Sequence, residues 1–150
     1  DRFSTLVNPG YLLPDRIVKL TGITNAMIVG KPNIYEVLPH FLKFVGDSII
    51  VGHHVEKDMA FIDKAYRVLY GKKFKHPHIC TLSLARNILP DLKRYSLKDL
   101  ADHFNIRYRR LHRALDDAET TAYLFIELLN LLWNHLRVGD YLGIKRLSKA

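Results

Sequence analysis

A short apolar run followed directly by a helical pattern is the feature that most constrains the fold of this chain. Residues 48–53 read SIIVGH, in which three consecutive residues are β-branched. Such an uninterrupted run is typical of a strand that is covered on both faces, as in parallel sheets. Residues 57–70 then repeat apolar side chains at the spacing of a helix with one buried face. A buried strand followed by a helix is the repeating unit of α/β proteins, so we expect an α/β fold.

Other segments fit the same class. Residues 3–8 mix β-branched, aromatic and small polar side chains before a Pro-Gly turn, which predicts a strand. Residues 79–81 are predicted to form a second short buried strand. Short helical turns are expected within residues 20–27, with Gly22 as a stop signal. Longer helices are predicted over residues 34–45, 82–89, 96–104 and 113–136, with Ser96 as the cap of the third.

The chain has no sequence signal of a membrane or secreted protein. Its apolar stretches are far shorter than the roughly 20 residues that cross a membrane. No charged start followed by an apolar run marks a signal peptide. The single cysteine, Cys80, excludes an internal disulfide and a cysteine-based zinc site. We therefore expect a cytoplasmic protein of one domain, which is the usual organisation at this length, with no membrane partner.

Positive charge is concentrated in one part of the sequence. The chain has 23 Lys and Arg against 15 Asp and Glu, a net charge of +8. Residues 71–113 contain eleven basic and three acidic residues, and the remainder contains twelve of each. This segment therefore carries the whole net charge, which favours a surface that binds a polyanion such as nucleic acid.

Asp58 stands in the first turn of the helix predicted over residues 57–70, shortly after His53 and His54. In open α/β sheets, ligands bind at the carboxyl ends of the strands, and this placement favours a site. A carboxylate in the first turn also interacts favourably with the helix dipole, by about 0.3–1 kcal/mol. Alone, the position of Asp58 favours this structural role.

Asp117 is distinguished from its neighbour Asp116 by helical geometry. At about 100° per residue, the centre of the apolar stripe in the 113–136 helix lies about 75° from Asp117 and about 175° from Asp116. We therefore expect Asp116 to face water and Asp117 to border the core. An unpaired carboxylate beside the core is costly, so Asp117 needs a partner, either a divalent cation or an arginine. The stripe consists of Ala114, Ala118, Thr121, Ala122, Phe125, Leu128, Leu129 and Leu132.

His112 lies five positions before Asp117 and two positions after the end of the basic run at residues 107–110. A neutral imidazole in such a place is suited to act as a general base. A histidine in a basic loop can equally be an exposed residue without a catalytic role. The residues around His112 leave both interpretations open.

Taken together, these segments resemble the DEDDh (DnaQ-like) family of 3′–5′ exonucleases, and within it the proofreading exonucleases of bacterial replicative DNA polymerases. The motifs that carry the resemblance are LTGIT, GHHVEKDMAFID, TLSLAR, YSLKDLADHF and HRALDDAETTAYLF. They occur in the family's order and cover about residues 3–132. The resemblance implies a ribonuclease H-like mixed sheet flanked by helices. We expect an exonuclease domain over residues 1–136 and a basic C-terminal extension over residues 137–150.

The resemblance also implies a reaction and a set of site residues. The family hydrolyses the terminal phosphodiester of DNA with two Mg²⁺ or Mn²⁺ ions held by four acidic residues. By motif, Asp58 and Asp117 are expected to bind metal, and His112 is expected to be the general base. The expected partners are a single-stranded DNA 3′ end and a DNA polymerase subunit or domain. Residues expected to contact nucleic acid are His53, His54, Lys57, Arg109, Arg110 and Arg113.

The sequence departs from the family pattern in two places. The second motif normally has His-Asn and an aromatic residue before its aspartate, whereas this chain has His53-His54 and Lys57-Asp58. The first motif, Asp-x-Glu on the first strand, does not occur upstream of Asp58. Two of the four acidic residues and the first two strands are therefore absent from the sequence. We expect the chain to be an N-terminally incomplete view of an active exonuclease.

Two alternatives to a DNA proofreading exonuclease remain open from the sequence. One keeps the chemistry but takes RNA or short oligonucleotides, because a metal site recognises phosphate and only the flanking pockets sense the 2′-hydroxyl. The other is a catalytically inert module that binds nucleic acid or a polymerase and has kept the fold.

Overall fold

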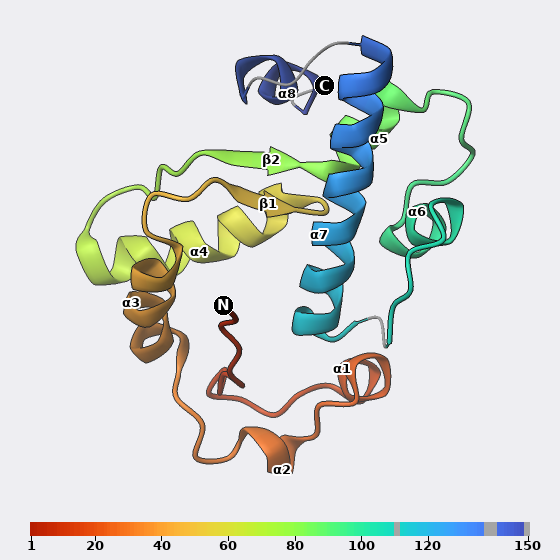
Figure 1. Ribbon diagram of the computed structural model, residues 1–150. Helices are drawn as coiled ribbons and strands as arrows, with labels where there is room; N and C mark the ends of the chain where they lie inside the picture. The colour runs from red at the N-terminus through yellow and green to blue at the C-terminus, as the bar shows by residue number, and fades with distance from the viewer. Residues whose placement is uncertain (110–111, 137–140, 149–150) are drawn as a thin grey trace. The chain divides into compact units, whose positions relative to one another are not determined.

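The computed structural model describes residues 1–109, 112–136 and 141–148 of an α/β protein (Figure 1). The predicted class is confirmed by a parallel pair of strands and the helices that accompany it. None of the described helices is both long and apolar enough to span a bilayer. The chain divides into two compact units, which we describe separately.

The first unit consists of Asp1–Ser48 and Ala60–Lys75. Its helix α3 (Ile34–Val45) has the predicted bounds, because Asn33 forms a capping box at its start. The Asn33 side chain accepts from two backbone N–H groups of the first turn, and Glu36 accepts from the N–H of Asn33 at 2.8 Å. Within the range predicted for short helical turns lies helix α2 (Asn25–Ile28), whereas helix α1 (Asp15–Thr21) lies mostly before that range and was missed from the sequence. Gly22 ends α1, as its predicted role of stop signal requires, and it adopts the left-handed conformation.

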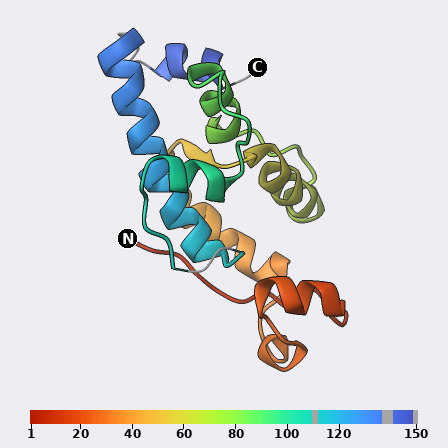
Figure 2. The same cartoon turned by 90° about the vertical axis from the view of Figure 1, so that its right-hand side faces the viewer.

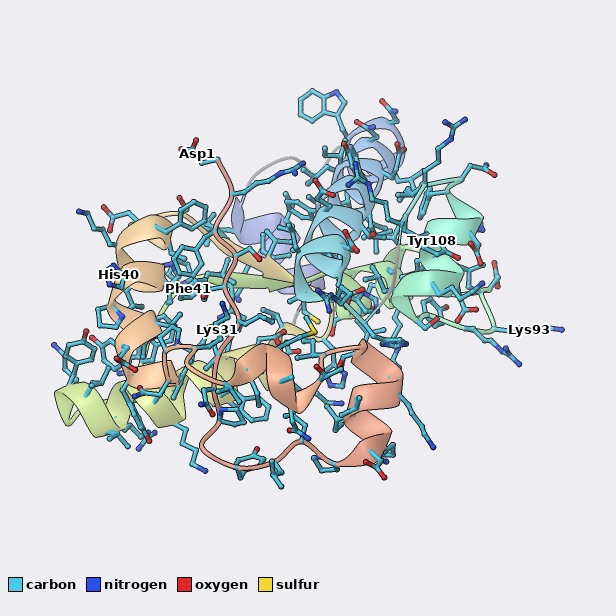
Figure 3. The ribbon with its side chains drawn as sticks, turned by 90° about the horizontal axis from the view of Figure 1, so that it is seen from below. Asp1, Lys31, His40, Phe41, Lys93 and Tyr108 are labelled. Atoms are coloured by element: carbon cyan, nitrogen blue, oxygen red, sulfur yellow. The ribbon has the colours of Figure 1, made fainter. Side chains whose placement is uncertain are left out.

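The strand predicted at residues 3–8 is wrong: within the described chain this segment belongs to no sheet. Its backbone is joined to the unit at Asn8, whose N–H donates to the carbonyl of Pro32 at 2.9 Å. Its main packing contact is Phe3, whose ring lies 5.9 Å from that of Phe41 and 5.6 Å from that of Phe44. Phe41 is labelled beside the segment in Figure 3. A sequence with strand propensity becomes a strand only where a partner strand accepts its hydrogen bonds.

The second unit consists of Ile49–Met59 and His76–Ala150 and contains the sheet. Strands β1 (Ile50–Gly52) and β2 (His78–Cys80) are parallel, with Val51 opposite Ile79. Both predicted apolar strands are therefore present and pair in the expected parallel orientation, but the residues of β1 are half-buried, so its predicted cover on both faces is not found. Helix α4 (Val55–Tyr70) begins directly after β1.

Four helices and a π-helical turn complete the second unit. The predicted helix at residues 96–104 is α6 (Leu97–His103), and Ser96 caps it by accepting from the N–H of Asp99. The long predicted helix is α7 (Ala114–Leu131), which continues as the π-helical turn η1 (Leu132–Leu136). Helices α5 (Thr81–Ile88) and α8 (Tyr141–Leu147) lie at one end of this unit (Figure 1).

The core of the second unit fixes the elements that carry the motif residues. Helix α7 packs against α5, α6 and β1, and both ribbon views show α6 beside it (Figures 1 and 2). Burial of each leucine in such a core contributes about 1.5–3 kcal/mol. Ile144 of α8 is buried in the same cluster, so part of the predicted C-terminal extension packs on it. The fully buried leucines are Leu84, Leu100, Leu124, Leu128 and Leu132.

Candidate functional site

Asp117 lies on the buried face of α7. The buried residues of α7 and η1 are Thr120, Thr121, Leu124, Leu128 and Leu132. At about 100° per residue, Asp117 lies within about 10° of the centre of this face, whereas the predicted offset was about 75°. Asp116, which was expected to face water, is half-buried, and so is Asp117. The sequence therefore placed Asp117 too far from the core, and its expectation that Asp116 faces water was wrong.

The electrostatics of Asp117 reflect this position. Burial raises the pKa of its carboxyl above the usual value, and the charge of Asp116 acts in the same direction. A hydrogen bond from the backbone of His112 and the charge of that residue act against the shift. No arginine or lysine of the described chain contributes, so the arginine partner considered from the sequence is not found there.

His112 is joined to Asp117 through its backbone. Its N–H donates to Oδ1 of Asp117 at 3.2 Å, and its side chain is exposed. His112 adopts a φ of 67°, which is uncommon for a residue with a side chain. Such a conformation persists where the surrounding structure determines it, and it is found preferentially at functional sites. The carboxylate therefore holds the turn that presents the imidazole.

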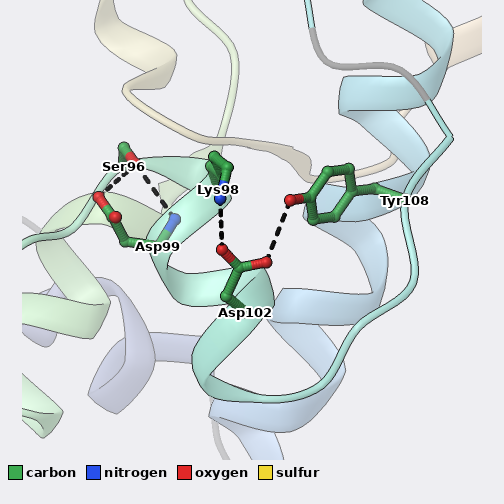
Figure 4. A network of polar contacts seen from close by, with 5 residues as sticks. All are labelled: Ser96, Lys98, Asp99, Asp102 and Tyr108. Atoms are coloured by element: carbon green, nitrogen blue, oxygen red, sulfur yellow. Dashed lines mark hydrogen bonds and ion pairs between the residues drawn. The ribbon is translucent and has the colours of Figure 1, made fainter.

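A polar network fastens the segment that leads from α6 to His112 (Figure 4). Lys98 donates to Oδ2 of Asp102 at 2.6 Å, and the Tyr108 hydroxyl donates to Oδ1 at 3.1 Å. These two hydrogen bonds hold the pKa of Asp102 below its usual value. Closer to α6, the N–H of Ile106 donates to the carbonyl of Ala101 in that helix at 2.8 Å. The segment is thus attached to α6 before it reaches α7.

A tight turn joins β1 to α4 and carries the two histidines of the second motif. A Cβ on Gly52 would lie 2.7 Å from Cγ2 of Val55, so the turn needs glycine there. His54 follows with a φ of 66°, and its carbonyl accepts from the N–H of Lys57 at 3.1 Å. The related family normally has asparagine at the position of His54, and asparagine is among the residues that tolerate this conformation best. The departure from the motif therefore preserves the turn but changes the side chain that it presents.

Asp58 lies on the first turn of α4 with an exposed side chain. Nearby protein atoms partly desolvate its carboxyl group, and this desolvation raises the pKa of Asp58 above the usual value. Its own backbone N–H and the charge of His54 act in the opposite direction, and that of Glu56 raises the pKa further. Asp117 is not among the groups that shift the pKa of Asp58, and Asp58 is not among those that shift the pKa of Asp117.

His53 is fixed by protein partners at both ring nitrogens. Nε2 lies 3.0 Å from the carbonyl of Tyr95, and because a carbonyl only accepts, Nε2 carries the hydrogen. Nδ1 lies 3.0 Å from the hydroxyl of Thr81, which is fully buried. Burial is the main reason that the pKa of His53 is lowered. Thr81 and Tyr95 were missed from the sequence, because their link to His53 spans 28 and 42 residues.

The basic residues expected to contact nucleic acid differ in their surroundings. Lys57 and Arg109 are exposed, and Arg113 is half-buried at the N-cap of α7. Arg110 lies outside the described residues. Beyond the predicted set, Lys93 projects away from the ribbon in Figure 3 and is exposed.

The described residues do not form a complete site for a divalent cation. Asp58 and Asp117 offer the carboxylate oxygens that Mg²⁺ and Mn²⁺ prefer. No group of three or more His, Cys, Asp or Glu side chains in the described chain is placed to hold a metal ion. Two carboxylates alone are a poor site for Mg²⁺, which needs dense oxygen ligation.

Comparison with known proteins relates the chain to nucleases. Residues 1–125 match the model of the family described as Exonuclease. A solved structure, "Exonuclease X in complex with 5' overhanging duplex DNA", matches with a TM-score of 0.72 and 27% identity. That match covers 96% of this chain and 79% of the other.

Two curated relatives carry DNA polymerase III in their names. "DNA polymerase III subunit epsilon" of Aquifex aeolicus is 56% identical over 150 residues, which are 100% of this chain and 74% of that protein. "DNA polymerase III PolC-type" of Clostridium perfringens is 45% identical over 122 residues. The second match covers 81% of this chain but only 8% of the relative.

Proposed function

This chain belongs to the exonuclease family, among its DnaQ-like members, and on that premise we propose that it is a 3′–5′ exonuclease that proofreads DNA during replication. The observation that carries the proposal is the hydrogen bond between the His112 N–H and Oδ1 of Asp117 at 3.2 Å. It joins two residues of the third family motif at the start of α7. The names of the polymerase III relatives support DNA as the substrate and a polymerase as the partner.

We assign His112 the role of general base, which accepts a proton from the attacking water at an imidazole nitrogen. The exposed ring and the turn held by Asp117 support this role. Asp58 and Asp117 are proposed as metal-binding carboxylates, with Mg²⁺ or Mn²⁺ as the cofactor and two ions in a complete site. The ligands that would complete such a site are not among the described residues. A polymerase partner also favours a cytoplasmic location.

The nucleic-acid contacts proposed here differ in kind. Lys57 and Arg109 are exposed cations that can pair with phosphates directly. We also propose that Arg110 and Arg113 contact nucleic acid, because both belong to the basic segment of residues 71–113. His54 presents an exposed ring, whereas the ring of His53 is occupied by Thr81 and Tyr95. We therefore propose that His53 supports the DNA contacts by holding the turn.

The proposal is tested by incubating the chain with a 5′-labelled single-stranded DNA oligomer, with Mn²⁺, with Mg²⁺ and with a chelator. A chelator-sensitive ladder that shortens from the 3′ end would support the proposal and would show that ligands beyond Asp58 and Asp117 complete the metal site. Asp117→Asn should abolish the ladder, and Asp116→Asn is the matched control on the same helix. Glu56→Gln serves the same purpose for Asp58→Asn, because both residues lie in the first turn of α4. A ladder from Asp117→Asn at close to the parent rate would refute the assignment.

One observation favours a second candidate, the catalytically inert nucleic-acid-binding or polymerase-associated module. The described residues contain no group of three or more potential metal ligands. This candidate predicts salt-sensitive binding of single-stranded DNA without cleavage under any metal condition.

A further inference from the structure

A lysine-rich loop follows α4 at the opposite end of that helix from Asp58. It reads GKKFK over residues 71–75, which we call the lysine loop. The sequence contains no acidic residue between Asp63 and Asp91. The loop lies in the first unit and leaves the last turn of α4 in Figure 1. It contains none of the residues assigned above to catalysis or nucleic-acid contact.

The backbone of the lysine loop is anchored to α4 at two points. Gly71 ends the helix with a φ of 67°, and its N–H donates to the carbonyl of Arg67 at 2.9 Å. Phe74 is 9% exposed, and its ring lies 5.2 Å from that of Tyr66. The N–H of Phe74 donates to Oδ1 of Asp63 at 2.7 Å. The loop is therefore ordered before any ligand binds, which lowers the entropy cost of binding.

The three lysines of the loop are exposed on this fixed backbone. In the described chain, none of Lys72, Lys73 and Lys75 forms a salt bridge. The nearby carboxylate, Asp63, already accepts from Phe74 and from Arg67 at 2.8 Å. These interactions hold the pKa of Asp63 below its usual value, and the charge of Lys73 adds a smaller effect in the same direction. Asp63 is paired with Arg67, and the three exposed lysines carry positive charge without an ion pair in the described chain, so the loop presents a net positive surface.

An exposed aromatic ring lies directly before the loop. Tyr70, the last residue of α4, is 44% exposed, and its ring packs 4.5 Å from that of Tyr66. The ring is therefore supported on one side and open on another. Cations beside an exposed aromatic ring are typical of surfaces that bind single strands, in which lysines contact phosphates and bases stack on the ring.

We propose that the lysine loop and Tyr70 form an accessory site for single-stranded nucleic acid, with Lys72, Lys73 and Lys75 on the phosphates and Tyr70 stacked on a base. The inference rests on the proposed function for the identity of the polyanion. The proposed site contains none of the motif residues. It would bind the single-stranded nucleic acid and take no part in the chemical step.

The test measures binding of a labelled oligo-dT by fluorescence anisotropy in the presence of a chelator, across a series of salt concentrations. Each phosphate contact in a single strand contributes about 0.7 to the slope of log K against log salt, so the Lys72→Ala/Lys73→Ala/Lys75→Ala variant should lower the slope by about 2. The control is Lys19→Ala/Lys31→Ala/Lys43→Ala, which removes the same charge from exposed positions of the same unit. An unchanged slope, or an equal loss in the control, would overturn the proposal.

Stacking on Tyr70 is tested separately. Tyr70→Ala should weaken oligo-dT binding about tenfold, and Tyr70→Phe should retain it. Tyr123→Ala, which removes an exposed tyrosine of α7, is the matched control and should bind like the parent. Parallel titrations with oligo-rU and with duplex DNA compare the affinity for single-stranded DNA, single-stranded RNA and a duplex. Preference for duplex DNA without an effect of Tyr70→Ala would overturn the single-strand assignment.

Cleavage is measured independently on a dinucleotide, which is too short to occupy both surfaces. The lysine variant should cleave it at the parent rate. If neither protein cleaves it but the salt slope changes as expected, the accessory site stands and the proposed exonuclease fails. If both cleave it and the slope is unchanged, the exonuclease stands and the accessory site is refuted.

Discussion

The backbone N–H of His112 donates to Oδ1 of Asp117 across 3.2 Å, so the carboxylate on the buried face of α7 fixes the turn that carries the imidazole. The two residues are coupled through the main chain, which leaves the ring of His112 available to a ligand. Separate substitutions can therefore remove the imidazole, the charge, or the geometry of the turn.

Replacement of His112 by glycine should remove the imidazole and keep the turn. Glycine adopts the φ of 67° without strain and retains the N–H that donates to Asp117. In the proposed exonuclease, kcat should fall about 10²–10⁴-fold, the usual contribution of a general base, while the melting temperature stays close to that of the parent. A parent-like kcat for His112→Gly would contradict the assignment of the base.

Neutralisation of Asp117 should stabilise the protein while it abolishes activity. Burial raises the pKa of Asp117 in the folded protein above its unfolded value. As pH rises between these two values, the carboxyl ionises more readily in the unfolded chain, so the free energy of unfolding falls. Asp117→Asn removes that ionisation and keeps an oxygen for the His112 N–H. Its melting temperature at pH 7 should exceed that of the parent by a few degrees.

The same comparison repeated at acid pH checks the cause of this stabilisation. Well below the unfolded pKa of about 3.9 the parent carboxyl is protonated in both states, so the difference between the parent and Asp117→Asn should disappear. Asp116→Asn is measured in parallel. A difference that persists at low pH would show that ionisation is not its origin.

His53 should make stability depend on pH near neutrality. The pKa of His53 in the folded protein lies below the ordinary 6.5. Between these two pKa values the unfolded chain binds more protons, so the free energy of unfolding is at its full value above about pH 6.5 and falls as pH drops toward the folded pKa. The free energy of unfolding should therefore decline below pH 6.5, and His53→Gln should flatten the decline. The exposed His40→Gln serves as the control in thermal melts at a series of pH values and should keep the parent profile.

Gly52→Ala should destabilise the second unit through a contact with Val55. The added Cβ would lie 2.7 Å from Cγ2 of Val55, and overpacking of this kind costs about 1–3 kcal/mol. In a double-mutant cycle by urea denaturation, Gly52→Ala should cost less when Val55→Ala is also present, because the clashing atom is gone. Strict additivity of the two substitutions would place the strain elsewhere.

Local patterns in the sequence predicted most of the helices. Periodicity and the caps at Asn33 and Ser96 depend on residues within one or two turns, so the bounds of α3 and α6 follow from the sequence. The strand expected at residues 3–8 depends on a distant partner, which a local pattern does not contain. The hydrogen bonds of His53 also join residues far apart in the sequence, so a local pattern does not predict them.

The prediction for α7 failed through the choice of side chains. Alanines were counted as core residues, yet Ala114, Ala118 and Ala122 are exposed. Thr120 is buried instead, because its hydroxyl donates to the carbonyl of Asp116 at 2.8 Å and no longer needs water. Residue polarity alone therefore misjudged the rotation of the helix, although it identified Asp117 as the inner carboxylate.

Helix α8 also bears on the colloidal behaviour of a shortened protein. Ile144 is buried against the core, Lys145 donates to the carbonyl of His78 at the start of β2, and Asn87 of α5 donates to the carbonyl of Leu147 at 2.5 Å. Removal of this helix would uncover apolar side chains of α5 and would take these partners from the carbonyl of His78 and the side-chain amide of Asn87. A chain cut at residue 136 should therefore aggregate at concentrations at which the 150-residue chain stays dispersed.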